Sequence, residues 1–268
     1  MKVFFICFLI QISFCSLLYS QVNTEVYRKK KDGERNWYAS ADASLTLQKG
    51  NSDTLNTINN IRIDYMTEKY FVFIVGNISW GESNGKVDTS KGFTHLRGGR
   101  EFFTSSVYME TFGQVEYNSF IKMKMRDLAG LSFRIRILKQ NFDEDEESFL
   151  LVYAAPGMMY EYEYLDTEKI AVLEKNPSHT PRMTSYISLK FLWRNHFSLN
   201  AVSYYQPDIL NWRDFRVISN FTMKVSIFEN LGLFTKFGFR YDNDPPELRT
   251  GSLDRYDVEL INGLEVSF

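Results

Sequence analysis

Most of this chain alternates apolar and polar side chains at every second position, and this period constrains the fold more than any other feature of the sequence. The last stretch, Tyr256 to Phe268, shows the alternation clearly, with Asn262 as the one polar interruption of its apolar register. Successive side chains of a β-strand point to opposite faces, so this pattern predicts a strand with one apolar and one polar face. No helical period stands out after residue 20, which favours an all-β fold.

Earlier segments alternate in the same way, and we expect about twelve strands in total. The expected strands cover 37–47, 55–65, 70–80, 93–103, 107–117, 131–137, 149–162, 187–194, 197–205, 215–224, 231–242 and 256–268. Most are longer than the ~5–6 residues typical of strands in soluble proteins, and they approach the ~9–11 that a tilted strand needs to cross a bilayer. An even number of strands returns both chain ends to one side, as bacterial single-chain barrels require.

The expected connections alternate in length along the chain. The long ones follow odd-numbered strands, at 48–54, 81–91, 118–127, 165–182, 206–213 and 243–254. The short ones follow even-numbered strands, at 66–69, 104–106, 195–196 and 226–230, and only 139–148 breaks the rule. Long outer loops and short periplasmic turns are typical of outer-membrane barrels. The sequence therefore predicts a transmembrane antiparallel up-and-down β-barrel.

The amino end predicts export. Residues 1–20 combine Lys2, an apolar run and a small residue, Ser20, before Gln21, which is typical of a signal peptide. The run is short for a transmembrane anchor, the alternative interpretation. We expect residues 21–34, with the basic run Arg28–Lys31, to form a flexible periplasmic lead-in, and residues 35–268 to form the barrel. Cys7 and Cys15 both lie in the expected signal peptide, so the mature chain would have no disulfide or thiol chemistry.

Composition narrows the expected partners. The chain has 31 basic and 33 acidic residues, a formal net charge of −2, which disfavours a nucleic-acid-binding protein. Aromatic residues make up 16% of the chain. Those near strand ends suit a membrane interface: Trp37, Tyr65, Tyr70, Trp80, Tyr117, Trp193, Tyr205 and Tyr241. We therefore expect the apolar face to contact outer-membrane lipid. Bacterial outer-membrane barrels commonly end on an aromatic residue that the barrel-assembly machinery reads, so this machinery is an expected partner of the strand ending at Phe268.

Charged residues in the polar register are the candidate lumen-facing residues. They are Asp42, Arg62, Asp64, Glu110, Glu116, Arg134, Arg136, Lys190, Arg216, Lys224, Lys236 and Arg240. Two interpretations of this set stay open. Opposite charges could pair across the interior and brace the barrel, or they could line an aqueous path and select solutes by charge. In the second case the surplus of Arg and Lys in the later strands favours anions.

No catalytic, cofactor-binding or metal-binding residue is expected. The acidic run Asp143–Glu147 lacks the spaced ligands and glycine of a calcium loop, and a solvated turn explains it. The three histidines, His95, His179 and His196, are too scattered for a metal triad. A lipid-active enzyme would need Ser and His together at an outward-facing strand end. His95 near Ser90 and Thr94 is the only approach to that arrangement, and we interpret His95 as a wall residue.

Several turn motifs occur together in one order along nearly the whole mature chain. They are Gly50–Thr54, Thr67–Lys69, Gly81–Ser83, Gly85–Lys86, Pro156–Gly157, Tyr241–Pro246 and Gly263–Phe268. With these motifs the chain resembles the salt-induced outer-membrane protein family, domain of unknown function 481. It departs from the family in the strand 131–137, which is less glycine-rich, and in the long connection 165–182. The resemblance implies an outer-membrane barrel of unknown activity.

The sequence therefore favours a non-enzymatic protein of the bacterial outer membrane. Our first hypothesis is a passive porin-like channel with a charged lumen. The alternative is a structural or interaction barrel with a plugged lumen, linked to envelope stress and recognising partners through its outer loops. A lipid-active outer-membrane enzyme is the third and weakest hypothesis.

Overall fold

The computed structural model describes residues 36–50, 53–143, 147–166, 176–194, 196–228, 231–245, 247–248, 251–252 and 254–266. The expected signal peptide, the whole of the expected lead-in region and Phe268 lie outside these residues. Within the described part of the chain, no helix is long and apolar enough to cross a membrane.

The described residues are almost all β-strand. The strands are β1 (Trp37–Gln48), β2 (Thr54–Met66), β3 (Tyr70–Ser83), β4 (Lys86–Phe102), β5 (Thr104–Asn118), β6 (Met123–Asn141), β7 (Ser148–Ala155), β8 (Gly157–Leu165), β9 (Ser178–Met183), β10 (Ser185–Trp193), β11 (Phe197–Pro207), β12 (Phe215–Phe228), β13 (Leu231–Asp242), β14 (Glu247–Leu248), β15 (Gly251–Ser252) and β16 (Tyr256–Val266).

Neighbours in sequence pair with one another throughout the main sheet. The order is β1-β2-β3-β4-β5-β6-β7-β10-β11-β12-β13-β16, with β8 paired to β6 and β9, and every ladder is antiparallel. Pro156 separates β7 from β8, because proline has no N–H for the ladder. Thr184 separates β9 from β10 on the facing strand. The pairing continues across both breaks, since the Thr184 amide donates to the Gly157 carbonyl at 2.9 Å. The described chain thus makes twelve successive spans, and the predicted all-β, antiparallel up-and-down topology and the strand number are confirmed.

The strands run further than the sequence predicts. The expected loop 81–91 is instead a tight turn at Asn84 and Gly85, whose φ angles of 50° and 75° are left-handed. Residues 123–127 belong to β6, and residues 178–182 belong to β9. Backbone ladder bonds form with polar and apolar residues alike, so pairing continues after the apolar alternation has faded. The alternation of connection lengths is therefore weaker than predicted. The longer connections 166–177, 208–214 and 243–255 still share one end of the sheet, which we call the loop end. We call the opposite end the turn end.

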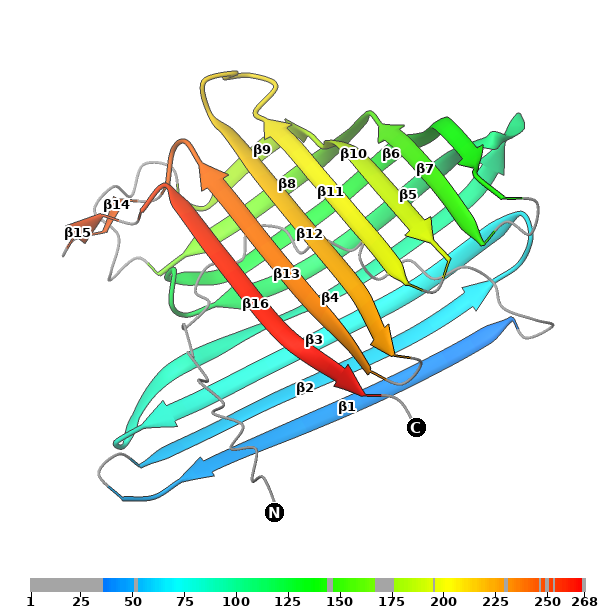
Figure 1. The fold of residues 1–268 in the computed structure, drawn as a ribbon. Coiled ribbons are helices and arrows are strands. Elements are labelled where there is room, and N and C mark those ends of the chain that lie inside the picture. Colours follow the sequence, from blue (N-terminus) through cyan, green and yellow to red (C-terminus); the bar gives the residue numbers. More distant parts are fainter. Residues whose placement is uncertain are drawn as a thin grey trace, which may run out of the picture.

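The sheet curls into a barrel. In Figure 1 the blue and cyan strands β1–β4 form one wall, and the yellow to red strands β11, β12, β13 and β16 form the wall facing it, with its strands running at an angle to those of the first wall. In the described ladders β1 pairs with β2 and β16 pairs with β13, so β1 and β16 are the two ends of the pairing path.

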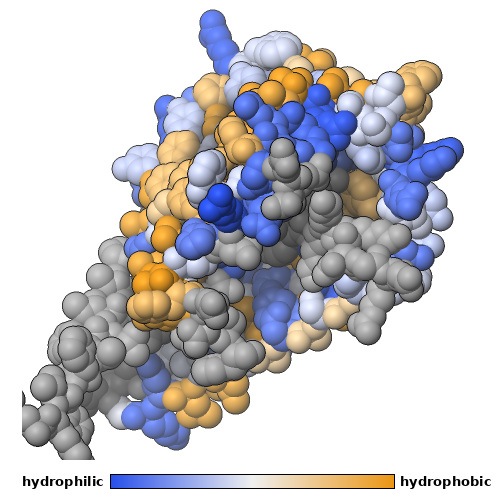
Figure 2. Space-filling model, turned by 45° about the vertical axis from the view of Figure 1, so that its right-hand side comes forward, coloured by the Kyte–Doolittle hydropathy of each residue, from blue (hydrophilic) through white to orange (hydrophobic). Residues whose placement is uncertain are grey.

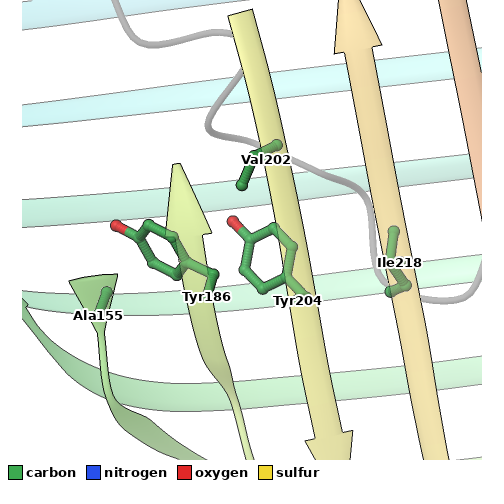
Figure 3. Packing of buried hydrophobic residues seen from close by; sticks show 5 residues of the cluster. All are labelled: Ala155, Tyr186, Val202, Tyr204 and Ile218. Atoms are coloured by element: carbon green, nitrogen blue, oxygen red, sulfur yellow. The ribbon is translucent and has the colours of Figure 1, made fainter. Parts of the chain in front are cut away.

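Buried apolar residues form two clusters on the inner face. One cluster contains Ala155, Tyr186, Val202, Tyr204 and Ile218, from β7, β10, β11 and β12. The Tyr186 and Tyr204 rings lie side by side with their centroids 5.0 Å apart (Figure 3). A second cluster contains Phe112, Leu128 and Met159. Apolar contacts therefore fill part of the interior and leave the rest to polar side chains.

Candidate functional site

Burial alternates along the strands and separates an inner from an outer face. On β5, Glu110, Gln114 and Glu116 are buried, whereas the intervening Val115 and Tyr117 are exposed. A soluble β-protein normally buries its apolar face and exposes its polar face, whereas here the polar face is buried and the apolar face is exposed. The inner face of this barrel is a polar interior, and any functional chemistry of the barrel wall belongs there.

The outer face is apolar between two groups of aromatic residues. Exposed aliphatic side chains along it include Ile61, Ile74, Ile78, Leu96, Val115, Ile187 and Leu260. At the turn end, Trp37, Tyr65 and Tyr70 follow one another with centroid distances of 4.7 Å and 6.0 Å. At the loop end, Tyr205, Phe215 and Tyr241 do the same at 5.7 Å and 5.6 Å. Figure 2 shows hydrophobic residues gathered along one flank of the surface, and hydrophilic residues gathered near the middle of the view.

The twelve lumen candidates differ in exposure. Six are buried: Arg62, Asp64, Glu110, Glu116, Arg134 and Arg216. Arg136 and Arg240 are half-buried. Asp42, Lys190, Lys224 and Lys236 are exposed. The alternation along each strand nevertheless places all twelve in the inner register, so the interior is tight in some parts and reached by solvent in others.

A continuous chain of polar contacts crosses the inner face near the loop end. We call it the charge belt, and it consists of His95, Gln114, Glu116, Arg126, Glu161, Glu163, Arg182, Asp214, Arg216 and Asp242. At one end His95 Nδ1 lies 2.9 Å from Gln114 Oε1, and the Gln114 amide donates to Glu116 at 2.8 Å. Arg126 then donates to Glu116 at 2.9 Å and to Glu163 at 2.7 Å. The belt links strands β4, β5, β6 and β8 without interruption.

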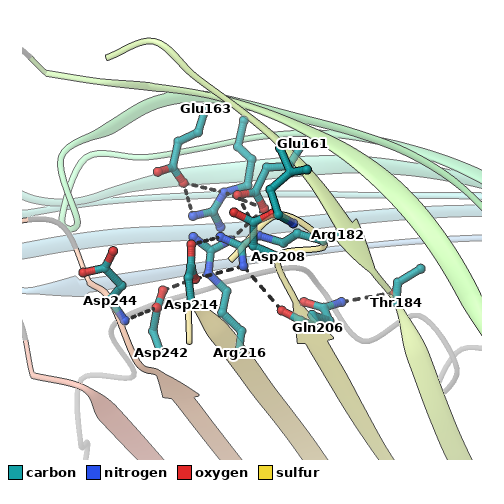
Figure 4. Close-up of polar contacts among 12 residues, drawn as sticks. Glu161, Glu163, Arg182, Thr184, Gln206, Asp208, Asp214, Arg216, Asp242 and Asp244 are labelled. Carbon is teal, nitrogen blue, oxygen red and sulfur yellow. Dashed lines mark hydrogen bonds and ion pairs between the residues drawn. The ribbon is translucent and has the colours of Figure 1, made fainter. Parts of the chain in front are cut away.

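Glu161 is the centre of the belt, because three arginines converge on its carboxylate (Figure 4). Arg216 donates to it at 2.7 Å, Arg182 lies at 3.4 Å and Arg126 at 4.0 Å. Glu161 lies on β8 and Arg216 on β12, and β9 and β11 separate them in the sheet. The Arg216 side chain therefore reaches past its neighbouring strands into the interior. Such charge-assisted bonds are short and directional, so they fix the spacing of these walls.

The belt also holds the connection between β11 and β12. The Arg182 guanidinium donates to both carboxylate oxygens of Asp214, each at 3.0 Å. The Ile209 amide donates to the Pro181 carbonyl at 2.9 Å. From the other side, the Asn243 amide group donates to the Arg213 carbonyl at 2.6 Å. This loop is therefore tied at several points to the rim of the barrel.

A second polar group lies nearer the turn end. Arg62 pairs with Asp64 on the same strand, and its guanidinium lies 5.2 Å from the centroid of the Phe73 ring. Arg97 NH1 lies 3.6 Å from Glu110, which also accepts a hydrogen bond from the Tyr186 hydroxyl at 3.2 Å. Tyr186 lies on β10 and Glu110 on β5, so this contact also joins strands that are not neighbours.

The residues weighed for catalysis or metal binding have structural contacts. His95 is fully buried between the Phe73 and Phe112 rings, and His179 Nδ1 lies 2.8 Å from the Tyr160 hydroxyl. Asp143 accepts the Ser148 amide at 3.0 Å, and hydrogen bonds from Ser148 lower the pKa of the Asp143 carboxyl. Residues 144–146 of the acidic run lie outside the described residues. In the described part of the chain, no three His, Cys, Asp or Glu residues group as metal ligands do.

The family model for DUF481, a protein of unknown function, matches residues 41–268. The chain belongs to the DUF481 family. The DUF481 chain is also similar to a solved NanC porin in a rhombohedral crystal form, at a TM-score of 0.43 and 6% identity over 87% of this chain and 99% of that one. A KdgM porin gives a TM-score of 0.38 and 9% identity over 87% and 99% of the two chains. These similarities are too low to assign a function. No curated protein matches the chain.

Of the charge belt in this DUF481 barrel, only Glu116 and Arg216 were among the predicted lumen-facing residues. Arg126 and Arg182 lie in segments expected to be loops, and Glu163 lies just past the expected strand 149–162; the structure places these residues in β6, β9 and β8. Glu161 lies within an expected strand, but its partners were not identified. Continuing the period of two beyond the apolar residues of each strand would have placed Arg126 and Glu163 in the inner register. The contacts between strands that are not neighbours carry no local signal.

Proposed function

We propose that the chain forms an outer-membrane β-barrel and acts as a narrow channel, with the charge belt as its constriction. The observation that carries this proposal is the opposite character of the two faces. The outer face is apolar between two aromatic groups, which suits a bilayer and its interfaces. The inner face holds arginines, lysines and carboxylates, which suit an aqueous path.

The proposed location follows from the unfavourable free energy of exposing the apolar outer face to water. Its exposed side chains include Leu96 at 50% and Leu260 at 62% of their full exposure. Such an apolar wall stays in solution only when something covers it. Lipid covers it without a partner protein. We therefore propose two partners. One is outer-membrane lipid, and the other is the assembly machinery that reads the strand ending at Phe268.

On the wall formed by β10 and β12, the inner side chains become more exposed from the belt toward the turn end. Along the inner register of β12, Arg216 and Ile218 are buried, Asn220 and Thr222 are half-buried, and Lys224 is exposed. Exposure rises in the same direction along β10, from Tyr186 through Ser188 to Lys190. On this wall a solute from the turn end therefore meets exposed polar side chains before the belt, whereas Arg62, Asp64 and Glu110 lie buried on the facing strands. In a channel of this shape the belt sets both the width and the charge of the narrowest point.

The decisive experiment measures conductance of the folded barrel in planar bilayers. We expect small, discrete steps for the unmodified protein. The double substitution Glu161→Gln with Arg216→Gln removes a link across the interior, and we expect it to raise the step size. Lys124→Gln is the matched control, because Lys124 pairs with Asp166 at 3.3 Å outside the belt. A barrel that inserts, shows heat-modifiable gel migration and never conducts would refute the channel.

The second candidate is a braced barrel with a closed interior. The burial of the belt favours it, since Arg126, Glu161 and Arg182 are each at most 4% exposed. In that case the outer loops carry recognition, and the belt is a structural brace. This protein would be silent in bilayers both before and after the Glu161 and Arg216 substitutions, whereas deletion of 167–175 would abolish capture of its partner.

A further inference from the structure

A row of hydrogen-bond donors crosses the inner face of the wall formed by β10–β13. Lys190 pairs in register with Asn200, Asn200 with Thr222, and Thr222 with Lys236. We call these four residues the basic row. They share the inner register with buried Tyr186 and Ile218, so their side chains project to the interior of the barrel.

The basic row is open to solvent, which separates it from the charge belt. Lys190 and Lys236 are exposed, and Asn200 and Thr222 are half-buried. Lys224 lies two residues beyond Thr222 on the same face and is exposed too. The ends of the row rest on aromatic rings, with Lys190 Nζ 5.8 Å from the Phe149 centroid and Lys236 Nζ 5.4 Å from that of Phe234. These ring contacts therefore hold the two ammonium groups in place on the wall.

Charge on this wall is strongly one-sided. Among the described inner-register residues of β10–β13, Asp242 is the one carboxylate, and it bonds Arg216 at the loop end. The nearest carboxylate on the next strand is Glu259 of β16, opposite Gly238. Positive charges gathered on one wall raise the local concentration of anions. The amide of Asn200 and the hydroxyl of Thr222 add neutral donors between the two lysines.

We propose that the basic row binds a linear polyanion that enters the barrel from the turn end. Adjacent strands are about 4.8 Å apart, so the Cα atoms of Lys190 and Lys236 are separated by about 14 Å across three steps. That span fits several anionic groups along one chain better than a single small anion. The inference deepens the proposed function by naming a ligand class. It depends on solvent reaching the interior, but it does not depend on conduction through the belt.

The test is calorimetric titration of the folded barrel, in a zwitterionic detergent, with inorganic tripolyphosphate. The variant Lys190→Gln, Lys224→Gln and Lys236→Gln should weaken binding about tenfold, at roughly 0.5 kcal/mol for each solvated charge. Replacing the same lysines with arginine should retain binding. Orthophosphate, as a single small anion, should bind much more weakly than tripolyphosphate.

The matched control removes three lysines from the loop end, as Lys86→Gln, Lys122→Gln and Lys124→Gln. Binding should survive in this control, because its three lysines lie away from the basic row. The net charge change equals that of the test variant, so a difference between the two variants reports position and not total charge. Equal loss in both variants, equal affinity in the test variant and the wild type, or no binding by the wild type would each overturn the proposal. If the triple variant shows no heat-modifiable fold, Lys236→Gln alone should still weaken binding about twofold. If the barrel binds tripolyphosphate but does not conduct, the proposal of this binding site stands and the proposal of a channel is refuted.

Discussion

Replacing Glu161 with glutamine tests whether the charge belt holds the barrel together. The substitution keeps the shape of the side chain and removes the negative charge that three arginines share. Losing one partner of a buried ion pair typically costs ~3–5 kcal/mol of stability. Here each arginine keeps another carboxylate: Arg216 keeps Asp242 at 2.8 Å, and Arg182 keeps Asp214 at 3.0 Å. We therefore expect a loss at the lower end of that range, about 3 kcal/mol.

The measurement is urea unfolding of the folded barrel in lipid or detergent, followed by tryptophan fluorescence and by gel migration. Asp166→Asn is the control, since Asp166 pairs with Lys124 at 3.3 Å and that lysine side chain is 49% exposed. Exposed pairs contribute ~0.2–1 kcal/mol, so this control should cost less than 1 kcal/mol. Equal costs for the two substitutions would refute the view that burial makes the belt important.

A double-substitution cycle separates the pair from its surroundings. We expect Glu161→Gln combined with Arg216→Gln to be less destabilising than the sum of the two single changes, by at least ~1 kcal/mol. The reason is that the double variant no longer buries an arginine deprived of its main partner. Additive costs would mean that the 2.7 Å contact between Arg216 and Glu161 contributes little.

Three further outcomes follow from the described contacts. Gly157→Ala should cost about 1–3 kcal/mol and reduce assembly, because its Cβ would lie 2.8 Å from the Leu131 carbonyl and 3.0 Å from the Thr184 carbonyl. Gly113→Ala is its control, with its nearest neighbour 3.9 Å away, and the two should differ clearly in urea unfolding. Asp214→Asn should speed trypsin cleavage within the connection 208–214, since Arg182 then loses a carboxylate that it binds at two points; an unchanged cleavage rate would show that the backbone contacts hold this loop alone. Removing Phe268 should lower the amount of assembled barrel in cells but leave refolding in detergent unchanged, as gel migration of both samples would reveal.

The sequence predicts the wall better than the interior. A period of two identifies each strand and both of its faces, because it reflects side-chain geometry that every strand shares. It does not locate strand ends, because polar residues such as Lys91 and Arg126 continue the ladder where the apolar signal stops. For the same reason the turn at Asn84 and Gly85 was expected to be a long loop. The contact between Tyr186 and Glu110 depends on the curvature of the whole sheet, which no local pattern records.

The charge belt and the basic row have different physical tasks. At the loop end, charges are buried and paired, so an added ion would have to displace an existing partner. On the wall formed by β10–β13, Lys190 and Lys236 of the basic row are exposed, so an anion can approach them at little desolvation cost. Substitutions in the row should therefore change which ions accumulate, whereas substitutions in the belt should change how fast they pass. If removing Lys190, Lys224 and Lys236 changed the conductance step as much as breaking the Arg216–Glu161 pair, this division would be wrong, and one continuous charged path would replace it.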